Sequence, residues 1–300
     1  MSATVTPDWI AVDWGTSNMR AWAMSASGTV LAEAASDQGM GKISRDGFEK
    51  ALLDVIGGWL TGPTQVIACG MVGSRQGWVE APYAATPCAA LPEGLTQAPT
   101  TDARLLVHVI SGIKQSDPAD VMRGEETQIA GFLALNKNWD GVICLPGTHT
   151  KWVHVSADEV VSFQTYMTGE LFNVIASQTV LRHSVAAEGW DAAAFHDGVT
   201  TAMARPERLA SRLFSLRAEG LLNGLEGAAA RARLSGLLIG AELAGAKPYW
   251  LGQQIAVIGD GTLAGHYVRA LAAQSAPATQ VNATAATLAG LTAAYRRMKG

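Results

Sequence analysis

The most informative stretch of this chain is Val12-Asp13-Trp14-Gly15-Thr16-Ser17-Asn18-Met19-Arg20, an apolar segment followed by a polar turn. Asp13 ends an apolar segment, and a carboxylate at the end of a buried strand is costly unless it is paired or holds a cation. A glycine and three short hydrogen-bonding side chains follow, and such a turn suits phosphate oxygens. An adjacent Asp can organise Mg²⁺, usually through water. We therefore expect strand, tight turn and strand over residues 9–24. The alternative is an ordinary hairpin in which Asp13 and Thr16 satisfy their own backbone.

A second glycine-threonine turn lies near the middle of the chain. Gly147-Thr148-His149-Thr150 follows the apolar segment 141–145, and Lys151 and Trp152 come after it. Arg20 and Trp22 follow the first turn in a similar way, once one or two residues are inserted to align the two stretches. This weak duplication indicates two related halves, although glycine-threonine hairpins are common.

Two further glycine loops follow apolar strands. Residues 65–69 lead into the loop 70–77, and residues 254–258 lead into Gly259-Asp260-Gly261-Thr262 and a predicted helix. A helix start behind a glycine turn favours an anionic or nucleotide ligand. The spacing does not fit GxGxxG, and no GxxxxGK[ST] occurs in the chain, so neither a dinucleotide fingerprint nor a P-loop is indicated.

Composition excludes several classes of protein. The 300 residues are 48% apolar and 16% charged, which is too apolar for a disordered or fibrous chain. A net charge of −4 without a basic run argues against nucleic acid or an anionic membrane as a partner. The three scattered cysteines indicate neither a disulfide framework nor a zinc site. The stretch Leu234–Ala246 is interrupted by Glu242 and too short for a bilayer, and the N-terminus lacks signal-peptide features, so we expect a cytoplasmic protein.

Apolar periodicity predicts the remaining elements. Helices are expected over 45–60, 122–136, 170–183, 207–218, 226–246 and 283–298, and strands over 105–110 and 159–165. The proline-rich stretch 80–104 is expected to form an irregular loop region.

With the three turns in this order, the chain resembles the superfold of acetate and sugar kinases, heat-shock ATPases and actin. The closer resemblance is to the 2-dehydro-3-deoxygalactonokinase family, whose pattern departs from this chain at the adenosine loop, where the family reads alanine-glycine-threonine-serine. The strings that carry the resemblance are Ile10–Asn18 with Arg20–Trp22, Gly70–Ser74 with Gly77-Trp78 and Ala81–Tyr83, Val121–Gln128, Pro146–His149 with Lys151–Val153, Met167–Leu171, and Leu234–Glu242.

The resemblance implies an α/β protein with the two-domain actin-like ATPase (sugar kinase) fold. Each domain would hold a central mixed sheet flanked by helices, with the substrates bound in an interdomain cleft. The N-terminal domain would cover residues 1–118 and be completed by the helix 283–298, and the C-terminal, nucleotide-binding domain would cover residues 119–282.

The implied activity is ATP-dependent phosphorylation of the 6-hydroxyl of 2-dehydro-3-deoxy-D-galactonate, giving 2-dehydro-3-deoxy-6-phospho-D-galactonate and ADP, in galactonate and galactose catabolism. ATP and Mg²⁺ are the implied cofactors, and a homodimer is left open. Three alternatives remain: a kinase of another sugar acid such as 2-dehydro-3-deoxygluconate, a phosphohydrolase on the same fold, and, ranked lowest, a nucleotide-gated binding protein.

The resemblance also implies roles for residues of the three turns. Asp13 would orient Mg²⁺ through water and so take part in catalysis. The ATP phosphates and adenosine would be bound by Gly15, Thr16, Ser17 and Asn18 of the first turn, by Gly147, Thr148 and His149 of the second, and by Gly259, Gly261 and Thr262 of the adenosine loop.

A general base should lie near the acceptor hydroxyl. We expect Glu125 to be that base, with Glu126 and Glu170 as rivals; acidic residues at a helix start can equally favour the helix dipole. Arg123 is the first choice for the sugar-acid carboxylate, ahead of Arg75. The other predicted substrate contacts are Gly70, Met71, Gly73, Ser74, Thr168, Glu170 and Trp78, of which Trp78 is either an apolar wall for the sugar or a core residue.

Overall fold

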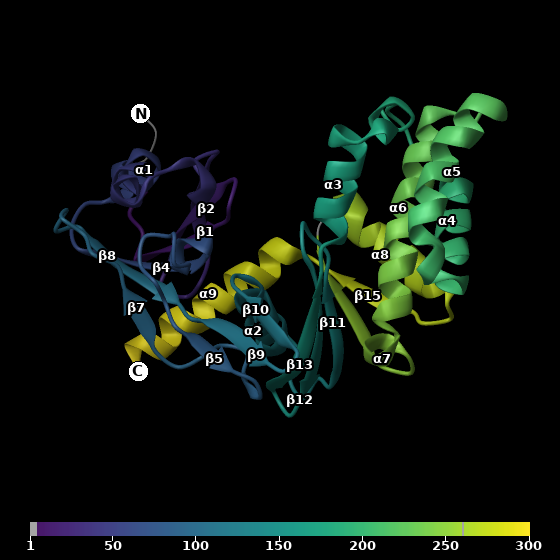
Figure 1. Cartoon of the computed structure of the whole chain (residues 1–300). Helices are drawn as coiled ribbons and strands as arrows, with labels where there is room; N and C mark the ends of the chain where they lie inside the picture. The colour runs from purple at the N-terminus through teal and green to yellow at the C-terminus, as the bar shows by residue number, and fades with distance from the viewer. Residues whose placement is uncertain (1–4, 260) are drawn as a thin grey trace. The chain divides into compact units, whose positions relative to one another are not determined.

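The computed structural model describes residues 5–259 and 261–300, which separate into two compact units (Figure 1). Unit 1 holds the chain up to Trp139 together with Ser156–Ser162 and Ala283–Gly300, and unit 2 holds Asp140–Val155 and Phe163–Asn282. None of the helices in the described part of the chain combines the length and the hydrophobicity needed to cross a bilayer.

Unit 1 is built on a six-stranded sheet with the order β3-β2-β1-β4-β8-β7. The central strand β1 pairs antiparallel with β2 and parallel with β4, as the predicted strand-turn-strand requires. Its residues Trp9 to Val12 are all buried, which is typical of a strand covered on both faces. The strands are β1 (Trp9–Trp14), β2 (Met19–Met24), β3 (Val30–Ser36), β4 (Thr64–Gly70), β7 (Leu95–Gln97) and β8 (Leu105–Ile110).

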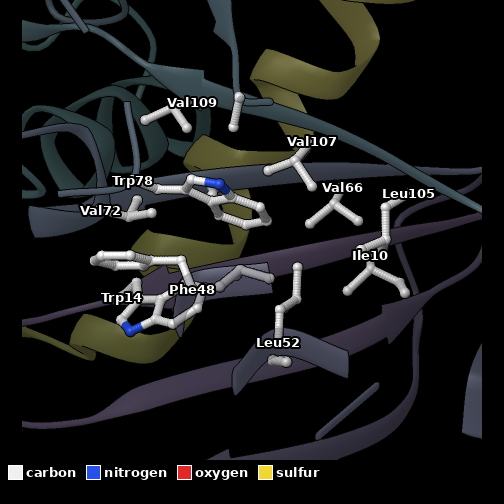
Figure 2. Packing of buried hydrophobic residues seen from close by; sticks show 14 of the residues in the cluster. Ile10, Trp14, Phe48, Leu52, Val66, Val72, Trp78, Leu105, Val107 and Val109 are labelled. Carbon is white, nitrogen blue, oxygen red and sulfur yellow. The ribbon is translucent and has the colours of Figure 1, made fainter. Parts of the chain in front are cut away.

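Aliphatic side chains and the aromatic rings of Trp14, Phe48 and Trp78 form the core on one face of this sheet (Figure 2). Helix α1 (Phe48–Ile56) buries Phe48, Leu52 and Ile56 there, one helical face at a spacing of four residues. The Phe48 ring stacks on Trp78, with centroids 6.1 Å apart, and lies 5.1 Å from Trp14. Burial of each such side chain contributes roughly 1.5–3 kcal/mol to the free energy of unfolding.

Two helices complete unit 1. Helix α2 (Glu125–Leu135) packs along α9 (Ala283–Lys299), which also lies against β1 and β4. The Trp9 ring of β1 stacks on Tyr295 of α9 at 4.5 Å. The predicted final helix is therefore confirmed, and it belongs to the same compact unit as the first strands.

The proline-rich stretch 80–104 holds more regular structure than expected. The strand β5 (Tyr83–Ala85) joins a small sheet in the order β10-β9-β5 with β9 (Gly112–Ser116) and β10 (Ala119–Met122). The two-residue strand β6 (Cys88–Ala89) pairs with Glu159 and Val160. The prediction of an irregular loop was wrong here because such short strands carry too few residues to show an alternating pattern.

Unit 2 repeats the strand order of unit 1. Its order is β15-β14-β11-β12-β13, with β11 antiparallel to β12 and parallel to β14, and in unit 1 the corresponding order is β8-β4-β1-β2-β3. This repeat is what an internal duplication predicts. The strands are β11 (Gly141–Leu145), β12 (Thr150–Ser156), β13 (Glu159–Tyr166), which belongs to unit 2 from Phe163 on, β14 (Ile255–Ile258) and β15 (Ala278–Val281).

Helices of unit 2 pack side by side (Figure 1): α6 contacts both α4 and α5. Helix α4 was not predicted, because its alanine-rich sequence has little apolar contrast between its faces. The helices are α3 (Thr168–Gln178), α4 (Ala192–Ala204), α5 (Leu209–Leu222), α6 (Gly227–Gly245), α7 (Lys247–Trp250) and α8 (Gly261–Ala273). The predicted domains, 1–118 with 283–298 and 119–282, stay a prediction.

Candidate active site

The β1–β2 turn of unit 1 presents hydrogen-bond donors to solvent. Its residues Thr16, Ser17 and Asn18 are exposed. The carbonyl oxygens of Gly15, Thr16 and Ser17 accept bonds from the backbone N–H groups of residues 39–41, at 2.9–3.2 Å. Because these carbonyls already accept hydrogen bonds from residues 39–41, the turn presents N–H groups and hydroxyls to solvent, and these are the groups that bind phosphate. Sequence analysis missed the supporting segment 39–41, whose only sequence signal was two closely spaced glycines.

Asp13 lies at the end of β1, beside this turn. Its Oδ2 accepts a bond from Arg20 Nη2 at 2.7 Å, and its Oδ1 lies 3.9 Å from the Cys69 thiol. Arg20 is also held by the Thr284 hydroxyl at 3.0 Å. The Asp13 side chain keeps 23% of its surface exposed, so the carboxylate is oriented by the ion pair and still reachable.

Two glycines bring further predicted residues to the same place in unit 1. Gly70, at the end of β4, and Gly124, before α2, have φ angles of +92° and +107°, which L side chains rarely adopt. A Cβ on Gly70 would lie 3.5 Å from Asp13 Oδ1, and a Cβ on Gly124 would lie 3.3 Å from the Gly70 Cα. The structure therefore gathers Asp13, Gly70 and the start of α2.

Glu125 and Glu126 begin α2 and differ in exposure. Glu125 is partly exposed, and its carboxylate accepts the Arg123 N–H at 3.0 Å. Glu126 is fully buried and accepts the Gly124 N–H at 2.6 Å and the Thr127 hydroxyl at 2.9 Å. Burial, followed by the charge of Glu125, raises the pKa of Glu126 to about 7. Of the two, only Glu125 has surface that a substrate could touch.

Arg123 is 8% exposed and packs over the Tyr83 ring, 4.3 Å from its centroid. Its Nη2 donates to the Ala81 carbonyl at 2.7 Å. Among the described residues, neither Arg123 Nη1 nor the buried Ser74 Oγ has a hydrogen-bond partner. Buried donors without partners are costly, so both are suited to an acceptor supplied from outside the chain.

The other predicted residues of the glycine loop are mostly enclosed. Met71 is partly exposed, but Gly73 is buried, and a Cβ there would lie 2.8 Å from Arg123 Nη1. Trp78 is 5% exposed, and its indole N–H donates to the Pro99 carbonyl at 3.0 Å. Figure 2 shows it within the aromatic core. This corrects the interpretation of Trp78 as a wall for the sugar: its surface is already used by Trp14 and Phe48.

The β11–β12 turn of unit 2 is fixed to the start of α3. The Thr148 carbonyl accepts the Glu170 N–H at 2.9 Å, and Gly169 lies so close to Gly147 that any Cβ would overlap the Gly147 carbonyl. The His149 ring contacts the Glu170 carboxylate at 2.6 Å. His149 and Glu170, predicted as a phosphate donor and as a rival base, are therefore partners of each other.

A cavity of about 480 Å³ adjoins this turn within unit 2. The turn, α3, α6 and the first residues of α8 form its walls, and its size is ordinary for a site that binds a small ligand. The lining residues are Gly147, Thr148, Thr168, Gly169, Phe172, Asn173, Trp190, Arg231, Ser235, Leu238, Ile239, Thr262, Leu263, His266 and Tyr267.

The adenosine loop lies at one edge of the cavity. Thr262 lines it, near the N-terminus of α8. Gly259 lies beside the second turn, since a Cβ on it would be 3.7 Å from Pro146 Cδ. Gly261 begins α8 without lining the cavity, and Asp260 lies outside the described residues. A helix N-terminus at this edge favours an anionic group.

Aromatic side chains form another part of the cavity wall. The Trp190 and His266 rings stack with centroids 3.8 Å apart and planes within 14°. Burial, followed by the charge of Arg269, lowers the pKa of His266 to about 4, so the ring is neutral near pH 7. Arg231 lies over the Phe172 ring at 5.0 Å. Sequence analysis missed these residues because separate segments contribute them.

Comparison with known proteins identifies the family. A profile described as 2-keto-3-deoxy-galactonokinase matches residues 13–294. The chain belongs to this family. A Rhizobium meliloti protein described as a probable 2-dehydro-3-deoxygalactonokinase is 42% identical over 95% of this chain and 96% of its own length. The 2-dehydro-3-deoxygalactonokinase of Escherichia coli is 32% identical over 96% of this chain and 97% of its own length.

Solved structures agree with this assignment. A Sinorhizobium meliloti protein provisionally described as a 2-dehydro-3-deoxygalactonokinase superposes with a TM-score of 0.91 at 40% identity, covering 97% of this chain and 99% of the other. A Porphyromonas gingivalis protein provisionally described as an N-acetylglucosamine kinase has a TM-score of 0.50 at 10% identity, covering 96% and 99%, and shares the fold alone. The predicted family, the α/β fold of the actin-like sugar kinases and the enzyme class of kinase are confirmed.

Proposed function

We propose that this protein transfers the γ-phosphoryl group of ATP to the 6-hydroxyl of 2-dehydro-3-deoxy-D-galactonate, giving 2-dehydro-3-deoxy-6-phospho-D-galactonate and ADP. The observation that carries the proposal is the cavity of unit 2, which joins the Gly147–Thr148 turn to an aromatic wall in a chain of this kinase family.

ATP is the ligand proposed for this cavity. The triphosphate would be bound by the N–H groups and hydroxyls of Gly147 and Thr148 and by the N-terminal end of α8 at Thr262. Trp190 and His266 offer flat apolar surface to the purine base, and Arg231 adds the positive charge that a polyphosphate ligand favours.

Unit 1 supplies the charged groups of the reaction. The turn Gly15 to Asn18 would contact the β- and γ-phosphates, and Asp13 would hold Mg²⁺ through water. Among the described residues no group of three or more His, Cys, Asp and Glu could hold a metal ion. A single reachable carboxylate nevertheless fits Mg²⁺, which usually keeps several waters and takes one or two carboxylates together with substrate phosphates. When bound, the ion neutralises charge on the transferred phosphoryl group.

Glu125 is the proposed general base. Its carboxylate would accept the proton of the 6-hydroxyl while that oxygen attacks the γ-phosphorus. The bond from the γ-phosphorus to the bridging oxygen then breaks, and ADP leaves with the electron pair. The partial exposure of Glu125 supports this role over fully buried Glu126. Glu170, in unit 2, is already paired with His149.

The sugar acid would be recognised by the end of β4 and the start of α2. Arg123 Nη1 and Ser74 Oγ have no hydrogen-bond partner in the described part of the chain, and they are proposed as donors to the substrate carboxylate and its hydroxyls. The backbone of Gly70, Met71 and Gly73 lies beside them. Thr168 lines the unit 2 cavity and is instead proposed to contact ATP. A cytoplasmic location and the two-domain division remain predictions.

A coupled ADP assay over a panel of 2-keto-3-deoxy sugar acids tests the proposal. We expect saturable ADP formation that depends strictly on the sugar acid and is fastest with the galactonate derivative. Phosphate release without any acceptor would indicate a hydrolase instead. A faster reaction with 2-dehydro-3-deoxygluconate would reassign the substrate while leaving the kinase chemistry in place.

A further inference from the structure

A buried carboxylate lies behind the cavity of unit 2, and the proposed reaction does not use it. Glu242 of α6 is 3% exposed. Its Oε1 accepts a bond from Trp152 Nε1 at 2.8 Å, and its Oε2 accepts one from the Tyr267 hydroxyl at 2.7 Å. The Thr168 side chain also hydrogen-bonds to it. One side chain therefore connects α6 to β12, α8 and α3.

The network reaches the second turn through Thr150. This residue directly follows His149, is fully buried, and has its Oγ1 2.9 Å from the Tyr267 hydroxyl. The Thr150 side chain also hydrogen-bonds directly to Glu242. Glu242 is therefore linked to Thr150 both directly and through the Tyr267 hydroxyl.

The same network forms walls of the cavity. Thr168 and Tyr267 line it, and Gly147 and Thr148 line it just before Thr150. Buried polar groups need their partners, so moving one member of this network moves the others. The carboxylate thus couples the position of the turn to two cavity walls.

The ionisation state of Glu242 depends on its surroundings. Burial raises its pKa to about 7, while the bonds from Thr168, Trp152, Tyr267 and Thr150 act in the opposite direction. The titratable groups that face it are Tyr267, Cys144 of β11 and Tyr166 of β13, and burial, followed by the Glu242 charge, raises the pKa of each. These three neighbours are neutral near pH 7, so hydrogen-bond donors stabilise the carboxylate.

We propose that Glu242 is a positioning residue for ATP: through Thr150, Tyr267 and Thr168 it holds the Gly147–Thr148 turn and the adjoining cavity walls in the arrangement that binds the nucleotide. The inference rests on the proposed function, because that function makes ATP the ligand of the cavity.

The test uses Glu242→Gln in the full chain. Glutamine keeps the shape of the side chain, and its carbonyl can still accept from Trp152. Its amide nitrogen donates and cannot accept, so at least one of the hydrogen bonds that Tyr267, Thr150 and Thr168 make to the carboxylate is lost. A hydrogen bond is worth about 0.5–1.5 kcal/mol, so we expect the Kd and KM for ATP to rise about tenfold with the KM for the sugar acid unchanged. A merely structural role would not separate the two KM values.

Glu219→Gln is the matched control. Glu219 pairs with Arg233, which also lies on α6, and its side chain is 31% exposed, so its loss should leave the Kd for ATP within about twofold of wild type. Tyr267→Phe provides a second variant if Glu242→Gln fails to fold. It leaves Glu242 in place, removes the hydroxyl that bridges Glu242 and Thr150, and should weaken ATP binding selectively in the same way.

Titration of each protein with ATP by calorimetry, alongside the ADP assay, separates the two claims. Weaker ATP binding in Glu242→Gln and Tyr267→Phe, with Glu219→Gln unchanged, would support the inference. Equal ATP affinity in wild type and both test variants would overturn it and leave the kinase assignment intact. An absence of ATP binding in the wild type would instead overturn the proposed function.

Discussion

The two hairpin turns lie at matching points of the two sheets, and their surroundings differ. In unit 1 the last strand pair before the turn is Trp14–Met19, preceded by Asp13–Arg20. In unit 2 the last pair is Leu145–Lys151, preceded by Cys144–Trp152. Unit 1 therefore has the partly exposed ion pair of Asp13 and Arg20 at this position. Unit 2 has the buried thiol of Cys144 and the buried indole of Trp152 there.

Under the proposed function, this difference suits the two units to different parts of the reaction. Beside the unit 1 turn, the reachable carboxylate of Asp13 lies near Gly70, which ends β4, and near Gly124, which precedes α2. The unit 2 turn opens into a cavity and is supported from behind by the buried Glu242 network. We infer that unit 2 mainly binds the nucleotide and unit 1 mainly carries out the chemistry.

The largest effect is expected from Asp13→Asn. The amide keeps the shape of the side chain but loses the charge that would hold Mg²⁺, so kcat should fall at least about a hundredfold. The Kd for ATP, set by unit 2, and the melting temperature should change little. Asp37→Asn removes the exposed ion pair with Lys42 and is the control. Turnover close to wild type in Asp13→Asn would contradict the assignment of the chemistry to unit 1.

Glu125→Gln should have the next largest effect. Without a base for the 6-hydroxyl, kcat should fall about a hundredfold while the KM for the sugar acid stays within a few-fold of wild type. Steady-state ADP formation measures both constants. Glu159→Gln, which changes an exposed carboxylate on β13, is the control. An unchanged kcat would move the base role to another residue.

Arg123→Lys tests whether unit 1 also binds the carboxylate of the sugar acid. Lysine keeps the charge but cannot reproduce the guanidinium fork, so the KM for the sugar acid should rise about tenfold or more, while the KM for ATP stays constant. The exposed Arg75, which pairs only loosely with Glu80, supplies the control Arg75→Lys. Equal sugar-acid KM values in Arg123→Lys and wild type would remove Arg123 from substrate recognition.

The smallest effect concerns stability. Burial raises the pKa of Glu126 to about 7, above its ordinary value of 4.5, so the folded state binds a proton that the unfolded state has lost. The free energy of unfolding should therefore fall as pH rises from about 4.5 to about 7. Glu126→Gln should reduce the difference in unfolding free energy between pH 5.5 and pH 8 by about 2 kcal/mol. Urea unfolding at both pH values measures it, and an unchanged pH dependence would place the titration elsewhere.

Local patterns in the sequence predicted the turns and the strands that hold them. Gly15 to Asn18 and Gly147 to Thr150 carry their turn chemistry in four consecutive residues, so their positions follow from local propensity. The family resemblance added the roles of Asp13 and Glu125.

Features that depend on distant packing were not predictable in this way. The aromatic wall pairs Trp190 with His266, residues 76 positions apart. Glu242 stood out only as an interruption in an apolar stretch, and its partners come from three other elements. The sequence alone could not distinguish a sugar-binding role of Trp78 from a place in the core, because a tryptophan is compatible with both until its neighbours are known.

A crystal structure with a non-hydrolysable ATP analogue and Mg²⁺ tests the central claim most directly. The account predicts the base against Trp190 and His266, the phosphates on Gly147 and Thr148, and the metal ion water-bridged to Asp13. A nucleotide bound outside the unit 2 cavity, or phosphates far from Asp13, would contradict it.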